Sequence, residues 1–244
     1  MLVLISVIFP YIYTTFSYAA SESTFFQGLR LEKRYMPDVE YWVTGTVDWK
    51  ATEIKVPAIA SDNIPIKAID DNTKINGVFQ GNIWLEKVDL SESRIEEIGA
   101  RCFYNCQKLK QYINSPYLKT VYGYAFQNAN LESITFNEGL ESIRPSAFED
   151  AFSNENKIYV IDIPDTVTEI YENAFKVTNK NYRVILVGEK GSAAEEYCKT
   201  DSTCTFVQRG DKIPTEEDLI QQEIEKEKKK LFVNKEFTYQ NYNN

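Results

Sequence analysis

Histidine is absent from this chain of 244 residues. Without an imidazole there can be no Ser-His-Asp or Cys-His catalytic arrangement and no histidine-liganded metal site. Basic residues are also in deficit, since 27 Lys and Arg stand against 36 Asp and Glu and leave a formal charge of -9. Because nucleic-acid binding needs clustered Lys and Arg to neutralise phosphates, this balance argues against a nucleic-acid partner.

Cysteine is scarce, with only Cys102, Cys106, Cys198 and Cys204. Neither pair has the CxxC spacing of a zinc site, so we expect no metal site. We expect no cofactor of another kind either. Cys198 and Cys204 flank a predicted turn and are the candidates for a local disulfide. Cys102 and Cys106 lie at inward-facing repeat positions, which favours small buried side chains over a bridge.

The N-terminus carries a long uncharged, mostly apolar run, which covers residues 1–20. It ends in Ser17-Tyr18-Ala19, the small-x-small pattern of a signal-peptide cleavage site. We predict that residues 1–19 are a signal peptide, removed on export. No other segment approaches the ~20 apolar residues of a membrane helix, so no span is expected afterwards. Because no Lys or Arg precedes the run, an uncleaved anchor is the alternative.

The chain does contain a repeat, best seen in residues 131–148, LESITFNEGLESIRPSAF. Similar segments begin at Leu85, Leu109 and Lys157. Two sets of markers advance by 23, 22 and 27 residues: Phe103, Phe126, Phe148 and Phe175, and Ile98, Val121, Ile143 and Ile170. Self-similarity at this period predicts a solenoid, in which each coil buries its apolar face against its neighbours.

Each coil is expected to have two extended pieces and a short helical turn ending in Ala-Phe. Alternation along the first piece of the 131–148 coil points Ile134 and Phe136 inward and Ser133 and Thr135 outward. The longer step of 27 residues places an insertion near 150–156, which we expect to bulge from one face as a loop.

The ends of the array carry different patterns. Residues 20–50 are predicted to be an N-terminal cap, with a strand at 41–49 and Trp42 and Trp49 covering the end of the core. Residues 51–208 are the solenoid, and its last coil ends in a short helix capped by Ser192. The tail, 209–244, is predicted to be a charged, solvated helix that begins near Thr215.

The motif LxxIxIPxxVxxIxxxAF resembles the BspA-like leucine-rich repeat family, the class typified by treponemal surface repeats. The match is best in IDIPDTVTEIYENAF, residues 161–175, and GSAAEEYCK resembles the usual end of such arrays. The resemblance covers roughly residues 52–208. It implies a β-rich leucine-rich-repeat solenoid of about 5–6 short coils with capping segments and a C-terminal helix. The chain departs from the family pattern where Tyr122, Arg144 and Tyr171 replace a common glycine.

The resemblance implies an exported, non-catalytic binding or adhesion module, secreted or held at the cell surface. Its expected partner is a host surface protein, a matrix protein or a glycan. One alternative is a structural spacer, or a fragment of a larger surface protein, with no ligand of its own. A glycan-acting solenoid enzyme is more remote, because neighbouring carboxylates such as Glu96 and Glu97 point to opposite sides of a strand.

A ligand surface is expected on the outward positions of the parallel strands, which form one continuous face. Apolar residues increase toward its C-terminal end, where they either form a binding patch or are covered by the tail helix or by loops of the solenoid itself. The predicted outward residues are Lys87, Asp89, Gln111, Ile113, Ser133, Thr135, Val160, Asp162, Val184 and Leu186.

Overall fold

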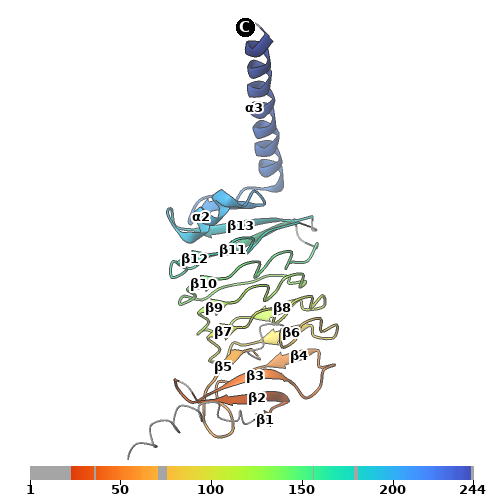
Figure 1. Ribbon diagram of the computed structural model, residues 1–244, viewed down its shortest axis with the longest axis vertical. Coiled ribbons are helices and arrows are strands. Elements are labelled where there is room, and N and C mark those ends of the chain that lie inside the picture. Colours follow the sequence, from red (N-terminus) through yellow and green to blue (C-terminus); the bar gives the residue numbers. More distant parts are fainter. Residues whose placement is uncertain (1–22, 36, 71–75, 156, 179–180, 243–244) are drawn as a thin grey trace, which may run out of the picture.

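The structure is a computed structural model that describes residues 23–35, 37–70, 76–155, 157–178 and 181–242, with side chains as far as Lys230 in the last helix. The predicted signal peptide, residues 1–19, lies outside this range. The repeats stack into a solenoid of short coils, which confirms the predicted fold class (Figure 1). Among the described residues, no helix combines the length and apolarity needed to cross a membrane.

One face of the solenoid is, within the described chain, a sheet of eight strands. In spatial order these are β1 (Ser23–Phe26), β2 (Leu29–Arg34), β3 (Glu40–Thr46), β5 (Ile66–Ile69), β7 (Glu97–Ile98), β9 (Thr120–Val121), β10 (Ser142–Ile143) and β12 (Glu169–Ile170). The first three pair antiparallel, and all later neighbours pair in parallel. The antiparallel strands therefore close the N-terminal end, within the residues predicted to form a cap.

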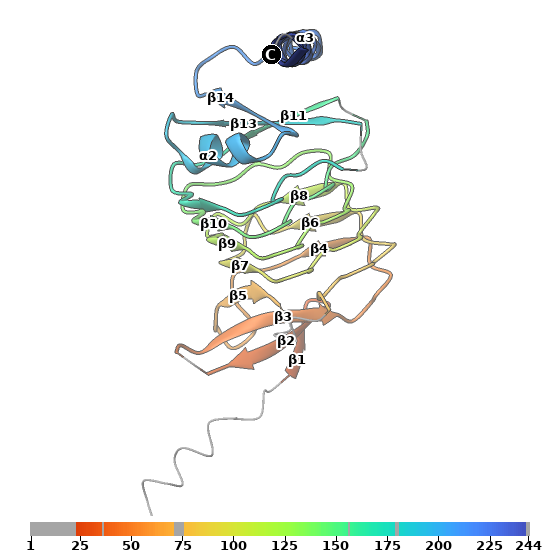
Figure 2. The same ribbon diagram turned by 45° about the horizontal axis from the view of Figure 1, so that its top comes forward.

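The opposite face consists of two shorter parallel sheets (Figure 2). The first contains β4 (Glu53–Lys55), β6 (Lys87–Asp89) and β8 (Gln111–Ile113), and the second contains β11 (Ile158–Asp162), β13 (Arg183–Gly188) and β14 (Cys204–Gln208). Successive strands pair without a shift in register. Because side chains alternate along a strand, this alignment keeps all inward residues in one column and all outward residues in another.

The prediction of a strand at residues 131–136 is wrong. Between the two short sheets this segment makes only an isolated bridge, from Leu131 to Phe152. The reason lies in the insertion, whose Ala151 and Ser153 take the backbone hydrogen bonds of Leu131. The expected bulge is also wrong for the first part of the insertion, because Phe152 is fully buried and its ring lies 4.6 Å from that of Tyr159.

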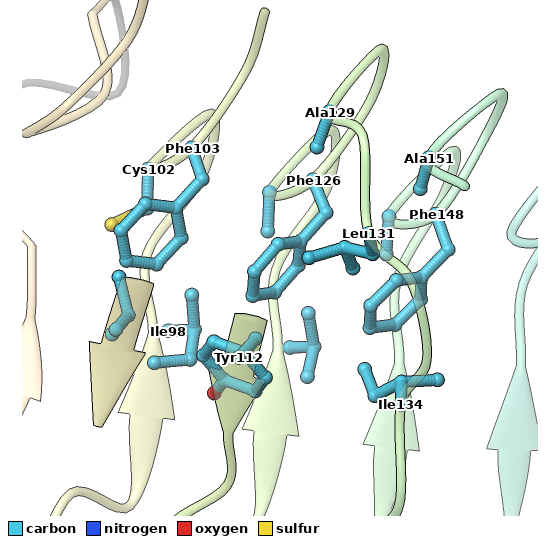
Figure 3. Close-up of a cluster of buried hydrophobic side chains, with 14 of the residues drawn as sticks. Ile98, Cys102, Phe103, Tyr112, Phe126, Ala129, Leu131, Ile134, Phe148 and Ala151 are labelled. Carbon is cyan, nitrogen blue, oxygen red and sulfur yellow. The ribbon is translucent and has the colours of Figure 1, made fainter. Parts of the chain in front are cut away.

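The core is built around a row of aromatic rings, one from each coil (Figure 3). Phe103, Phe126 and Phe148 stack with centroid distances of 5.1 Å for each pair. Phe79 continues the row at one end at 5.6 Å, and Phe175 continues it at the other at 5.2 Å. All five rings are at most 1 % exposed, so each coil is held by apolar contact with its two neighbours.

A backbone ladder runs beside these rings. Phe103 N–H donates to the carbonyl of Ala125, and Phe126 N–H donates to that of Ala147, at 2.7 and 2.8 Å. The expected helical turn at this corner is instead a tight turn with residues in the left-handed region, among them Asn105 and Asn128 at φ 57° and 56°. Asparagine tolerates this conformation better than most residues, which explains its presence two residues after phenylalanine.

The C-terminal end is closed by α2 (Ala193–Thr200), against which the last ring of the row packs. The hydroxyl of Tyr197 accepts the Phe175 N–H at 2.9 Å, where earlier coils use the carbonyl of the following coil. Ser192 occupies the N-cap position, but its side chain makes no capping bond, contrary to prediction. The structure joins Cys198, at the end of α2, to Cys204 at the start of β14 by a disulfide.

The tail forms α3 (Glu216–Tyr242), which extends beyond the last coil (Figure 1). Thr215 and Asp218 make a reciprocal capping box, with bonds of 2.9 and 3.2 Å between each side chain and the other residue's N–H. Leu219 is buried against the solenoid, and Arg183 makes a two-pronged ion pair with Glu223. The described part of α3 is otherwise exposed, as predicted for a solvated helix.

The two tryptophans of the predicted cap differ in their environment. Trp42 is partly buried beneath Arg34, whose guanidinium lies 4.5 Å from the ring. Trp49 is 47 % exposed, so it does not cover the core, contrary to prediction. Leu29, Leu31 and Val43 of the β2–β3 hairpin take that place, because all three are buried in the main core.

Replacing Phe126 with alanine should lower the free energy of unfolding by about 3–5 kcal/mol, because it opens a cavity in the ring row. The change is measured by chemical denaturation followed by circular dichroism. Phe25→Ala is the control: its ring is 65 % exposed, and a change of about 0.5 kcal/mol or less is expected. Equal effects of the two substitutions would show that the ring row does not hold the coils together.

Tyr197→Phe removes only a hydroxyl, yet it deprives the buried Phe175 N–H of its acceptor and the Asp201 carboxylate of a donor. We expect a loss of about 1–3 kcal/mol, the usual effect of leaving a buried donor unpaired. The matched control is Tyr117→Phe, because that side chain is 53 % exposed. Denaturation curves of the two variants measure the difference, and a neutral Tyr197→Phe would contradict the capping role of the hydroxyl.

Candidate binding surface

The surface that the sequence analysis predicts for a ligand lies on the side of the two short sheets. We define the strand face as the outward side chains of β4, β6, β8, residues 133–135 and β11. Aligned pairs such as Lys87 with Gln111, and Asp89 with Ile113, place these side chains in two columns. Backbone bonds from Lys110 to Glu86, and from Glu132 to Lys110, continue the same alignment into the segment that contains Ser133 and Thr135.

The N-terminal end of the strand face is charged, and its charges are engaged within the chain. Lys87 forms an ion pair with Glu53 at 2.7 Å. Asp89 accepts hydrogen bonds from the backbone and hydroxyl of Ser91, at 3.0 and 2.6 Å, and so supports its own turn. Burial alone would raise the pKa of Asp89, but these bonds and the nearby lysines lower it. Both predicted residues point outward, but their polar groups already have partners.

The centre of the strand face differs from this end. Gln111, Ser133 and Thr135 are exposed, and their side chains make no hydrogen bond to the described part of the chain. Ile113 and Val160, which flank them, are 41 % and 47 % exposed. These five residues, which we name the central patch, combine apolar area with uncommitted polar groups, the usual composition of a contact surface.

At the C-terminal end of the strand face, as at the N-terminal end, the charged side chains form ion pairs within the chain. Arg209 binds Asp162 at 2.9 Å, Asp165 at 2.8 Å and Glu189 at 3.1 Å. The hydrogen bonds to Asp162 and Asp165 raise the pKa of Arg209, which stays charged. Asp162 is therefore outward as predicted, but it is part of an ion cluster that ties β11 to the chain after β14.

The predicted outward positions of Val184 and Leu186 are wrong. Both are buried in the main core, with exposures of 1 % and 0 %. Val160 pairs with Ile185, so Ile185 and Val187 are the outward residues of β13. Both are also buried, because Leu219 of α3 packs on them. With every residue of β13 apolar from Val184 to Val187, alternation could not reveal the inward side, and the tail helix covers the apolar end.

The eight-stranded face carries a cavity that the sequence analysis did not predict. It has a volume of about 280 Å³ and is lined by Trp42 of β3 and by carboxylates from β3 and β7. Lys67 and Lys119 flank Glu96 at 3.1 and 2.7 Å and form a ladder of alternating charge. The signal was available in the sequence two residues ahead of successive buried positions, since Lys67, Glu96, Lys119 and Glu141 precede Ile69, Ile98, Val121 and Ile143.

The pKa values of two neighbouring carboxyl groups in this region, Glu96 and Glu97, are shifted in opposite directions. Burial raises the pKa of Glu97, and the charges of Glu40, Asp70 and Glu96 add to the effect. Burial would also raise the pKa of Glu96, but hydrogen bonds from Lys119 and Lys67 outweigh it and lower the pKa. No group of side chains able to hold a metal ion occurs in the described residues.

Comparison with known proteins gives consistent results. The family model described as "BspA type Leucine rich repeat region" matches residues 73–198 in six copies. A leucine-rich repeat protein of Treponema pallidum has a similar fold, with a TM-score of 0.55 and 19 % identity over 77 % of this chain and 84 % of that one. A search of the curated proteins finds no match.

Two further solved structures show weaker likeness. A leucine-rich cell surface protein from Faecalibacterium prausnitzii has a TM-score of 0.40 and 18 % identity over 68 % of this chain and 54 % of that one. A leucine-rich repeat protein from Bacteroides capillosus has a TM-score of 0.38 and 16 % identity over 68 % of this chain and 99 % of that one.

The opposite pKa shifts of the two carboxyl groups lead to opposite predictions. A raised folded-state pKa means that ionised Glu97 opposes folding above its ordinary pKa, so Glu97→Gln should be more stable than the parent at pH 7. Ionised Glu96 favours folding, so Glu96→Gln should be less stable at pH 7. The Glu97 difference should fade as the pH falls below about 4.3, the ordinary pKa of Glu. The Glu96 difference should persist to lower pH and fade only as the pH falls through the lowered folded-state pKa of Glu96. Thermal unfolding from pH 3 to 8 measures them, and equal signs would refute the assignment.

Proposed function

Because the chain belongs to the BspA-type leucine-rich repeat family, we propose that it is a non-catalytic binding module that works at or outside the cell surface. Its site is the central patch of the strand face, and its partner is a host surface or matrix protein or a glycan. The observation that carries the proposal is the contrast along that face. Charges at both ends are paired within the chain, while the centre presents exposed apolar groups and unengaged polar groups.

The patch suits a contact role for a physical reason. Gln111, Ser133 and Thr135 supply donors and acceptors without a charge, so a partner need not remove water from an ion to reach them. Ile113 and Val160 contribute exposed apolar surface, and binding is favoured when a partner removes this surface from water. Since the residues come from three successive coils, the stacked backbone holds them in place, and little ordering is needed on binding.

The charges around the central patch contribute more to the choice of ligand than to the affinity for it. The patch is flanked by ion pairs, such as Lys87 with Glu53 and the Arg209 cluster, which remain solvated at the rim. Rim charges mainly steer a partner and reject one of the wrong polarity, while the uncharged centre supplies the contact. An acidic chain with this patch should therefore prefer ligands that do not carry a high negative charge.

Thr135→Arg tests the proposal, because it places a long charged side chain on an exposed position and leaves the core unchanged. The full chain is first applied to arrays of matrix proteins and glycans, and the affinity for each ligand found is then measured for the variant. We expect the dissociation constant to rise at least about tenfold, which corresponds to ~1.4 kcal/mol. Thr168→Arg, at an exposed position ahead of β12 on the other face, is the control and should bind as the parent does.

The outcomes separate the competing functions. Ligand binding that Thr135→Arg leaves intact would move the site away from the central patch. Absence of any ligand would support the structural spacer. Turnover of a glycan on the array would support the enzyme, in which case the cavity beside Trp42 would be the region to mutate first.

A further inference from the structure

The strand β14 is the last in its sheet, and its outer edge has no neighbouring strand in the described part of the chain. Within the sheet, Arg209 N–H donates to the carbonyl of Gly188 at 2.8 Å. Because backbone groups point alternately to the two sides of a strand, residues 205 and 207 face β13 in the same way. The backbone groups of Cys204, Phe206 and Gln208 therefore point to the open edge.

Some of these outward groups are already bonded. Cys204 N–H donates to the carbonyl of Asp201 at 3.2 Å, and the carbonyl of Gln208 accepts from Asp211 N–H at 3.0 Å. Phe206 N–H and C=O, Cys204 C=O and Gln208 N–H have no such local partner among the described residues. An edge with this many unpaired groups is a template for another strand.

Space for a strand is present at this edge. A groove of about 550 Å³ follows β14 along residues 205–208. Two lysines and two acids flank it, Lys190, Lys212, Glu195 and Asp211, so the groove carries both signs of charge equally. The start of α3 packs over the outer face of β13 and β14 through Leu219, and Pro214 and Gln222 border the groove on that side without filling it.

We propose that β14 pairs antiparallel with β14 of a second copy of this chain, about a two-fold axis at Phe206. At that axis each Phe206 N–H donates to the Phe206 carbonyl of the other copy. The next bonded pair joins Cys204 of one copy to Gln208 of the other, and it needs only the Gln208 N–H and the Cys204 C=O. These are the groups left unpaired, so the arrangement satisfies every outward group of the strand.

The occupant is a second copy because the arrangement is self-complementary. The pattern of used and unused groups is symmetric about Phe206, as an isologous interface requires. Lysines and acids line the groove in equal numbers, so the groove itself brings no net charge to the contact. The helix α3 extends past the last coil, toward the side where the partner would lie, and carries Ile220 and Ile224 at 41 % and 40 % exposure (Figure 1).

The experiment compares the full chain with Gln208→Pro and Gln208→Ala. Proline removes the outward N–H of residue 208 without touching a bond to β13, and proline is tolerated at strand edges. Both variants lose the side-chain bond from Gln208 to Glu189, which makes them a matched pair. Sedimentation velocity should show dimers for the parent and Gln208→Ala, while Gln208→Pro should dissociate at least about tenfold more readily.

Hydrogen exchange of the unmodified chain provides a readout that does not depend on how the variants fold. The amides of Phe206 and Gln208 should exchange more slowly as the concentration of chain rises, whereas those of Thr205 and Val207 should be protected at every concentration. A parent that is monomeric throughout, including one that pairs β14 with a peptide of a different protein, would overturn the proposal. So would a dimer that Gln208→Pro leaves intact, or exchange at Phe206 and Gln208 that does not depend on concentration.

Discussion

The structure depends on contact between successive coils, because no coil of this size can bury its own apolar side chains. The row of rings from Phe79 to Phe175 supplies that contact, and the backbone ladder beside it fixes the spacing. A ring that stacks on its neighbours and an N–H that must reach the next carbonyl allow only one alignment. Every outward side chain, and hence any binding surface, inherits its position from this alignment.

Each end of such a stack needs a cap, because a terminal coil has no neighbour to accept its backbone N–H groups or to cover its apolar side chains. At the N-terminus the antiparallel strands form the cap, and their residues Leu29, Leu31 and Val43 cover the end of the core. At the C-terminus the Tyr197 hydroxyl replaces the missing carbonyl, and Leu219 covers the outer side of β13. The outer edge of β14 has no neighbouring strand among the described residues, so further strand pairing can continue from it.

The strand face shows how far pattern alone could locate a site. Gln111, Ile113, Ser133, Thr135 and Val160 could be assigned outward from alternation, because each lies next to an unambiguous inward residue. In β13 that contrast is lost, since both sides of the strand are buried. The engagement of Asp162 by Arg209, 47 residues away, could not be read from the sequence either, because it depends on where the chain returns after β14.

The amino-acid pattern alone was enough to predict the solenoid, its approximate number of coils, the residues of the ring row and the burial of Cys102 and Cys106. These follow from periodicity, which is a local property repeated along the chain. Which faces remain open follows only from the folded chain: Phe152 of the insertion is buried in the core, α3 covers the apolar end, and Trp49 is exposed. Such outcomes depend on contacts between residues distant in sequence, whose free energies no local pattern records.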